Sequence, residues 1–219
     1  MKGYSKAAHF FNPAEKEAIE AATRAAESST IGEIAVMVVD ASSRYREAEV
    51  FGGITLGNII AFLVTVFFFD ESIWWYVPLT GVFFFPFWLL FRRIPVLKIH
   101  FVAPARREHA VQGRALRAFY EKGLYRTARN TGVLFFISIL ERKVWVLADK
   151  GIHEKITQAR LNGFAKAVSE GIRQGRAADA LAKAIHEAGE LLREHFPIQD
   201  GDTNELPDAI IIESKPDDD

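Results

Sequence analysis

Four oxygen-bearing side chains stand at the ends of predicted strands, and together they could bind a hard cation. Asp40 ends the first strand, Asp149 ends the third, and Asn130 and Thr131 lead into the second. If the first and third strands run parallel and the second runs antiparallel to them, all four residues meet at one end of the sheet. Open α/β sheets often bind ligands at strand ends, and Ca²⁺ and Mg²⁺ prefer oxygen ligands. We therefore predict a Ca²⁺ or Mg²⁺ site made of Asp40, Asn130 and Asp149.

The alternative for Asp40 and Asp149 is structural, because aspartate commonly caps helices and turns. A cation titration separates the two interpretations: a bound cation should raise the melting temperature of the wild type but not of Asp149→Ala. Arg176, which follows Gly175, could pair with an acid inside the domain or offer its guanidinium to an anionic partner.

Standard catalytic motifs are absent from the sequence. There is no Gly-x-x-x-x-Gly-Lys phosphate loop, no His-Glu-x-x-His and no Gly-x-Ser-x-Gly. His186, Glu190 and Glu194 have helical spacing, which fits a solvated helix face or, as the alternative, a metal site. The chain has no cysteine, so disulfides and thiolate chemistry are excluded. We therefore predict no catalytic and no cofactor-binding residues.

The charge balance also excludes a class of partner. The 27 basic and 28 acidic side chains give a net charge of −1, which is not typical of a general nucleic-acid binder. Aromatic residues are unevenly spread instead, because many of the 18 Phe fall in one segment near the middle of the first half.

This segment predicts a transmembrane hairpin. Residues 50–69 and 73–91 contain no charged side chain, and each would form a helix of roughly 30 Å, the thickness of a bilayer core. The short link between them forces the two helices to be antiparallel. Trp74, Trp75 and Tyr76 follow the link as an interfacial aromatic belt would. The alternatives are a buried pair of core helices and a re-entrant hairpin broken at Pro78 or Pro86.

Basic residues flank the hairpin and its turn is acidic. The basic flanks are Arg44, Arg46, Arg92, Arg93, Lys98, Arg106 and Arg107. The positive-inside rule then predicts a multi-pass protein of the cell (inner) membrane, with the soluble domain and both termini in the cytoplasm. Residues 1–14 contain no apolar run of signal-peptide length, which agrees with this orientation.

The remaining segments have the periodicity of ordinary helices and strands. Asn12, Pro13 and Glu15 predict a helix start with a capping box, and this helix should reach about Ser28. The expected strands are residues 33–39, 132–140 and 143–148, of which the last two form a hairpin. The expected later helices are residues 104–122, 153–174 and 178–195.

Apolar strands flanked by helices predict an α/β fold: a three-layer α/β/α sandwich interrupted by the two-helix transmembrane hairpin. Residues 1–49 and 94–196 would form the soluble domain and residues 50–93 the hairpin. Residues 197–219 are acidic and contain proline, and we expect a disordered tail there.

Four stretches resemble the TPM domain family, named for thylakoid-lumen, photosystem-repair and receptor-modulating proteins. They are residues 30–34 (TIGEI), residues 127–152 (TARNTGVLFFISILERKVWVLADKGI), Gly175-Arg176 with the helix at 178–185, and residues 204–210 (NELPDAI). The last stretch is similar to the tail of bacterial membrane-bound members.

The resemblance implies an α/β/α sandwich, often tethered to a membrane, with roles in the assembly, maintenance or repair of membrane complexes. Some members are reported to bind calcium or other divalent cations, and phosphatase activity has been suggested. This chain departs from the family in two respects. Many relatives carry a signal peptide and work outside the cytoplasm. Where relatives often have Asp-Asn-Gly, this chain has Asn130-Thr131-Gly132, so one formal charge is lost.

Two functions follow as expectations. In the first, the protein is a membrane-tethered TPM-like binding module whose partners are the lipid bilayer and other membrane proteins, and not nucleic acid. The alternative is a weak metal-dependent phosphatase with acid-phosphatase-like activity. An assay with an Asp149 variant as control would distinguish them.

Overall fold

The chain folds into two compact units. The computed structural model describes residues 5–69, 72–127, 129–199 and 205–213. One unit comprises Met1–Ser43 and Glu108–Asp218, and it is the α/β unit. The other comprises Arg44–Arg107, and it is the hairpin unit.

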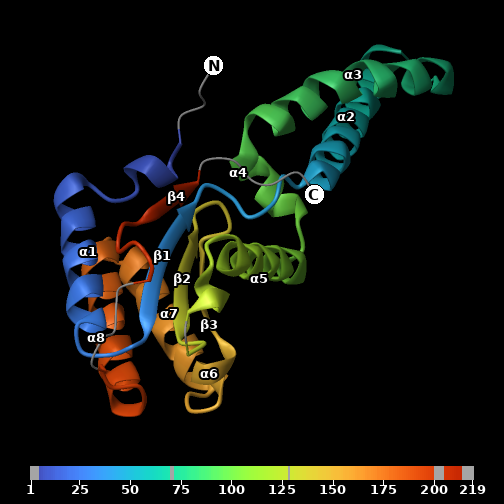
Figure 1. Ribbon diagram of the computed structural model, residues 1–219. Helices are drawn as coiled ribbons and strands as arrows, with labels where there is room; N and C mark the ends of the chain where they lie inside the picture. Colours follow the sequence, from blue (N-terminus) through green and yellow to red (C-terminus); the bar gives the residue numbers. More distant parts are fainter. Residues whose placement is uncertain (1–4, 70–71, 128, 200–204, 214–219) are drawn as a thin grey trace. The chain divides into compact units, whose positions relative to one another are not determined.

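A four-stranded sheet forms the centre of the α/β unit (Figure 1). The strands are β1 (Glu33–Val39), β2 (Gly132–Ser138), β3 (Lys143–Ala148) and β4 (Ile211–Glu213), in the order β3-β2-β1-β4. β1 is parallel to β2 and to β4, whereas β2 and β3 form an antiparallel hairpin. The predicted hairpin is therefore confirmed, but the expected orientation of the first strand is wrong. The long connection between β1 and β2 contains several helices, and such a crossover allows parallel pairing.

Helices cover both faces of the sheet, because β1 alternates between two apolar cores. Ile34, Val36 and Val38 belong to the core shared with α1 (Pro13–Glu27), α7 (Gln158–Arg173) and α8 (Ala177–His195). Ala35, Met37 and Val39 belong to the core shared with α5 (Pro104–Glu121). The chain thus has the predicted mixed α/β fold, with strands buried on both sides as a continuous apolar run requires.

Local signals in the sequence set several element ends. The Asn12 side chain accepts a hydrogen bond from the Glu15 N–H at 2.9 Å, and the Glu15 carboxylate accepts one from the Asn12 N–H at 2.7 Å. This capping box confirms the predicted start of α1. Gly123 has a φ of 79° and ends the turn after α5, which is a conformation that glycine adopts without strain. The helix predicted at 153–174 is instead two helices, α6 (Lys150–His153) and α7, because residue 157 is extended.

The C-terminal segment corrects the expectation of a disordered tail. β4 pairs with β1 through Met37↔Ile211, Val38↔Ile212 and Val39↔Glu213. The acidic composition of residues 197–219 favoured a solvated tail, but three consecutive isoleucines at 210–212 provide an apolar strand for the edge of β1. Residues 200–204 and 214–219, which belong to the same predicted tail, lie outside the described residues.

Two long apolar helices, α2 (Arg46–Phe68) and α3 (Ile73–Arg93), form the hairpin unit together with α4 (Pro95–Lys98) and the short 3-10 helix Ile99–Phe101. α3 is continuous through Pro78 and Pro86. Both helices are long and apolar enough to cross a membrane. In the most apolar window of each, 28% of the α2 residues and none of the α3 residues are buried within the structure.

Small residues bring the two helices together. Gly53, Gly57, Ala61 and Thr65 recur at every fourth position of α2 and are buried. A Cβ atom on Gly57 would lie 3.1 Å from the Phe84 nitrogen and 3.2 Å from the Phe83 carbonyl carbon, so the backbones of α2 and α3 are in close contact there. Close approach through small residues is typical of helix pairs in membranes.

Candidate functional site

Asp40 lies at the carboxyl end of β1 and has a structural role. Its Oδ1 accepts hydrogen bonds from the Ala7 N–H at 2.6 Å and from the Ser5 hydroxyl at 3.2 Å. Its own N–H donates to the Glu213 carbonyl at 3.2 Å. The carboxylate thus holds the N-terminal segment against the edge of the sheet, as the capping alternative predicts.

Asn130, Thr131 and Asp149 lie at the opposite end of the sheet. Because β1 and β2 are parallel, the residues that lead into β2 are beside the start of β1, and the antiparallel β3 brings Asp149 to the same end. A seven-residue strand is roughly 20 Å long, so Asp40 is far from Asp149. The predicted three-residue cation site is therefore wrong as a set, because its premise of parallel first and third strands is wrong.

Asp149 and Asn130 nevertheless come together. Asp149 is the N-cap of α6, and its Oδ1 accepts a hydrogen bond from the Lys150 N–H at 2.7 Å. A Cβ atom on Gly151 would lie 2.7 Å from the carbonyl oxygens of both Arg129 and Asn130, so the backbone of the turn after β3 packs against the backbone of residues 129 and 130. Asn130 has a φ of 55°, a left-handed conformation that asparagine tolerates better than most residues.

The Oδ2 atom of Asp149 has no assigned role at this end of the sheet. Oδ2 of Asp149 is buried and makes no hydrogen bond within the described residues. A carboxylate oxygen suits a hard cation, but Ca²⁺ takes six to eight oxygen ligands. Among the described residues, no group of three or more His, Cys, Asp or Glu side chains is placed to hold a metal ion. Asp149 and Asn130 together would therefore supply only part of the ligand set that a cation needs.

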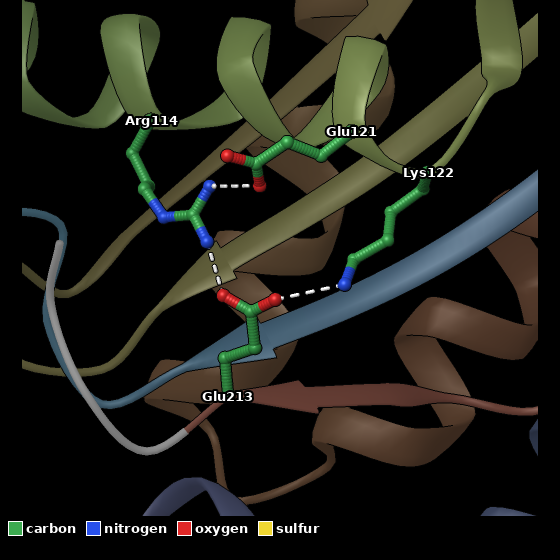
Figure 2. Close-up of polar contacts among 4 residues, drawn as sticks. All are labelled: Arg114, Glu121, Lys122 and Glu213. Carbon is green, nitrogen blue, oxygen red and sulfur yellow. Dashed lines mark hydrogen bonds and ion pairs between the residues drawn. The ribbon is translucent and has the colours of Figure 1, made fainter.

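Arg114 forms the centre of a charge cluster between α5 and β4 (Figure 2). Its side chain is almost completely buried and donates to the carboxylates of Glu121, at 3.2 Å, and Glu213. Lys122 lies 2.9 Å from the second oxygen of Glu213. Burial raises the pKa of Glu213, but the hydrogen bonds and charges of Lys122 and Arg114 outweigh it and hold this pKa below its ordinary value. The cluster fastens β4 to the α/β unit.

A second group of acids holds the segment before β4. The Glu27 carboxylate accepts a hydrogen bond from the Ile34 N–H at 2.8 Å and faces Asp208, and Glu33 accepts one from the Glu205 N–H at 3.1 Å. Burial, together with the nearby charges of Glu33 and Asp208, raises the pKa of Glu27 to about 8. A neutral Glu27 can donate its proton to Asp208, which makes the contact between the two carboxyl groups favourable.

Glu27→Gln should therefore remove a decrease in stability that the wild type shows between about pH 4.5 and pH 8. In the wild type, unfolding returns Glu27 to a pKa near 4.5, so its stabilising contribution is complete below that pH and is lost as the pH rises through about 8. Because the side chain is partly exposed, we expect a loss of only about 1 kcal/mol between pH 5 and pH 9. Glutamine mimics the neutral acid, so the variant should show a flatter profile in thermal unfolding. If the stability of the two proteins changed with pH in the same way, the raised pKa of Glu27 would be contradicted.

A buried hydroxyl network lies at the carboxyl ends of β1 and β2. The Ser42 hydroxyl donates to Ser138 at 2.8 Å, Ser138 donates to Glu141, and the Ser42 N–H donates to Glu141 at 3.0 Å. All three residues are less than 5% exposed. Both oxygens of the Glu141 carboxylate thus accept a hydrogen bond, and the network stabilises the turn between β2 and β3.

The other positions singled out in the sequence lie on the surface. Arg176 donates to the Gln174 side chain, so within the described residues it pairs with an amide and not with an acid. His186 lies 3.7 Å from Glu190, and both side chains are more than half exposed. This agrees with a solvated helix face.

Comparisons with known proteins agree with this architecture. Residues 97–191 match the family model of the TPM domain. The NMR structure of BA42 protein from the psychrophilic bacterium Bizionia argentinensis is similar in fold, with a TM-score of 0.59 over 93% of this chain and 96% of that chain. The two sequences are 20% identical, so the likeness concerns the fold alone. The comparison with curated proteins gave no match. The resemblance noted from the sequence motifs is confirmed by these matches.

Proposed function

Because this chain carries a TPM domain, we propose that it is a membrane-tethered binding module that assists the assembly, maintenance or repair of membrane protein complexes. In this proposal, α2 and α3 cross the bilayer and the α/β unit offers its surface to other membrane proteins. The observation that carries the proposal is the apolar surface of the hairpin. Large side chains such as Phe62, Phe67 and Phe85 are more than half exposed in it, and a soluble protein seldom exposes so large an apolar patch.

The polar groups of the hairpin suit an apolar solvent. The Asn58 side chain donates to the Ile54 carbonyl at 2.7 Å and accepts a hydrogen bond from the Tyr76 hydroxyl at 3.0 Å. Thr65 and Thr80 donate to carbonyl oxygens of their own helices, at 2.8 Å and 2.7 Å. Since lipid offers no hydrogen-bond partner, such internal satisfaction is what a bilayer requires.

The charges at the ends of the hairpin support the cytoplasmic orientation. Arg44 and Arg46 precede the first span, and Arg92 and Arg93 end the second. Trp74 and Trp75 lie at the opposite end and are exposed, as residues of an interfacial belt would be. We therefore propose a multi-pass protein of the inner membrane, with the α/β unit and both termini in the cytoplasm.

An acidic substitution on the hairpin surface tests the membrane location. Phe62→Asp in α2 should remove much of the protein from carbonate-washed membranes, because an acid is strongly unfavourable at the centre of a bilayer. Leu116→Asp in α5, where the leucine is 48% exposed, is the matched control and should leave the protein in the membrane fraction. Recovery of the wild type in the soluble fraction would contradict the proposal.

Weak divalent-cation binding at Asp149 is a second candidate function, supported by the buried Oδ2 atom that makes no hydrogen bond. Asn130 would contribute a carbonyl oxygen and Asp149 its carboxylate, and the cation would be Ca²⁺ or Mg²⁺. The suggested phosphatase activity of the family would depend on such a cation.

Paired variants test this second candidate. We expect millimolar Ca²⁺ to raise the melting temperature of the wild type and of Asp40→Asn, each relative to its own cation-free value, but not that of Asp149→Asn. Asp40 is the matched control because it lies at the other end of the sheet. An equal shift in Asp149→Asn, or no shift in any protein, would exclude the site.

A further inference from the structure

We propose that the outer edge of β3 and the groove around it bind an extended acidic peptide of a partner protein, which joins the sheet as an additional strand. The proposal deepens the binding function proposed above by naming its surface and the chemistry of its partner. It rests on that function only for its biological role, because the peptide-binding surface belongs entirely to the α/β unit.

The main chain of β3 is available for pairing. β3 is the edge strand of the described sheet and pairs with β2 alone. The Asp149 N–H donates to the Gly132 carbonyl at 2.9 Å, so Asp149 directs its main-chain groups toward β2. These groups alternate along an antiparallel strand, and therefore Val144 and Val146 direct their N–H and C=O groups outward. An outward row of unpaired donors and acceptors is the template that strand addition requires.

A groove of about 900 Å³ lies along the first half of this edge, at residues 143–145, and is lined from both faces of the sheet. On the α5 face it contains Val111 and Trp145, and on the α7 face it contains Ala165 and Ile172. Successive side chains of an added strand point to opposite faces. A groove with walls on both faces can therefore receive both sets of side chains of a bound peptide.

The charge of the groove selects the peptide. Lys166 and Arg173 project from the exposed surface of α7, and Arg142 lies in the turn between β2 and β3. Arg142 and Lys166 form no ion pair within the described residues, and Arg173 has only a long contact of 3.8 Å with the exposed Glu170.

The two acids of the groove are already engaged. Glu108 lies 3.0 Å from Lys143, and Glu141 accepts hydrogen bonds from Ser42 and Ser138. The net field of the groove is therefore positive, which favours a peptide with acidic side chains on its α7 face and apolar side chains on its α5 face.

The first experiment measures peptide binding to the full chain in detergent micelles. The probe is a fluorescein-labelled ten-residue peptide of alternating valine and glutamate, followed by fluorescence anisotropy. We expect saturable binding, weakened about tenfold by Lys166→Glu with Arg173→Glu, since two favourable contacts become repulsive. Arg160→Glu is the matched control, because Arg160 is exposed on the same helix and lies outside the groove. It should leave the affinity unchanged.

The second experiment separates strand addition from charge attraction. Hydrogen exchange at the Val144 and Val146 amides should slow on binding, whereas exchange at Leu147, which already faces β2, should not change. A peptide with N-methyl groups on every second residue, chosen to block its bonds to β3, should not bind.

Several results would overturn the proposal: no binding of the valine–glutamate peptide, equal affinity in the doubly substituted protein, or equal binding of the N-methylated peptide. Slowed exchange at Val144 and Val146 on raising the protein concentration alone would also overturn it, because a second copy of the chain would then occupy the edge. Binding in micelles does not depend on whether the hairpin crosses a bilayer, so failure here is distinguishable from failure of the membrane tether.

Discussion

Replacement of Arg114 by alanine is expected to lower the free energy of unfolding of the α/β unit by about 3 kcal/mol, because it removes a buried guanidinium together with its ion pairs to Glu121 and Glu213. Arg114 is 1% exposed and contacts both Glu121 and Glu213. Hydrogen exchange of the β1 and β2 amides in the full chain measures this change. β4 should lose its protection first, because the cluster holds this strand through the Glu213 side chain (Figure 2).

A variant of Lys122 provides the matched control. The Lys122 side chain is 31% exposed and contacts the same Glu213 carboxylate, so Lys122→Met should cost less than about 1 kcal/mol. The contribution of Glu213 should be present at neutral pH and lost as the pH falls through its lowered pKa. Similar, small effects of both substitutions would mean that Arg114 does not hold the cluster together.

Gly57→Leu is expected to destabilise the packing of α2 against α3 by about 2 kcal/mol, the usual cost of forcing a larger side chain into a well-packed contact. The added side chain would meet the backbone at Phe83 and Phe84, which cannot move as a flexible side chain can. Dyes on cysteines at Val50 and Ile94, both exposed, report separation of the helices by energy transfer during an SDS titration.

Gly81→Leu is the control for this prediction. A Cβ atom at Gly81 has nothing within 4 Å, so the larger side chain should be tolerated. Equal SDS midpoints for the two glycine variants would mean that α2 and α3 do not pack through Gly57.

The secondary structure was largely predictable because its signals are local. The capping box at Asn12 and Glu15 starts α1 as expected, and Gly123 ends the turn after α5. The uncharged runs at 50–69 and 73–91 correspond to α2 and α3. The relative direction of β1 and β2 was not predictable in this way, because the connection between them is long enough for either direction.

The charge cluster could not be predicted because its members are far apart in the sequence. Glu213 is 99 residues from Arg114, and its strand of three residues is too short to show alternation. One signal was present: Arg114 falls on the apolar face of its helix, beside Val111, Ala115 and Ala118. A charged residue at such a position requires a buried partner. The acidic C-terminal segment could have been considered as the segment that provides this partner.

The predicted cation site shows the same contrast between local signals, which are predictable, and contacts between distant segments, which are not. Asp149 and Asn130 are correctly placed together, because an antiparallel hairpin fixes the end of β3 beside the start of β2. Asp40 was assigned to the same end only through the assumed direction of the first strand, and the structure places it at the other end. A site that depends on one non-local pairing fails when that pairing is reversed.

Cysteine accessibility in intact cells tests the membrane tether most directly, because the chain contains no cysteine of its own. Ser72→Cys reports on the turn between α2 and α3, and Lys183→Cys reports on α8, where the lysine side chain is 77% exposed. Both variants should react with an impermeant maleimide after the cells are permeabilised. In intact cells, our account predicts labelling of Ser72→Cys alone. Labelling of Lys183→Cys in intact cells would contradict it and would place the α/β unit outside the cytoplasm.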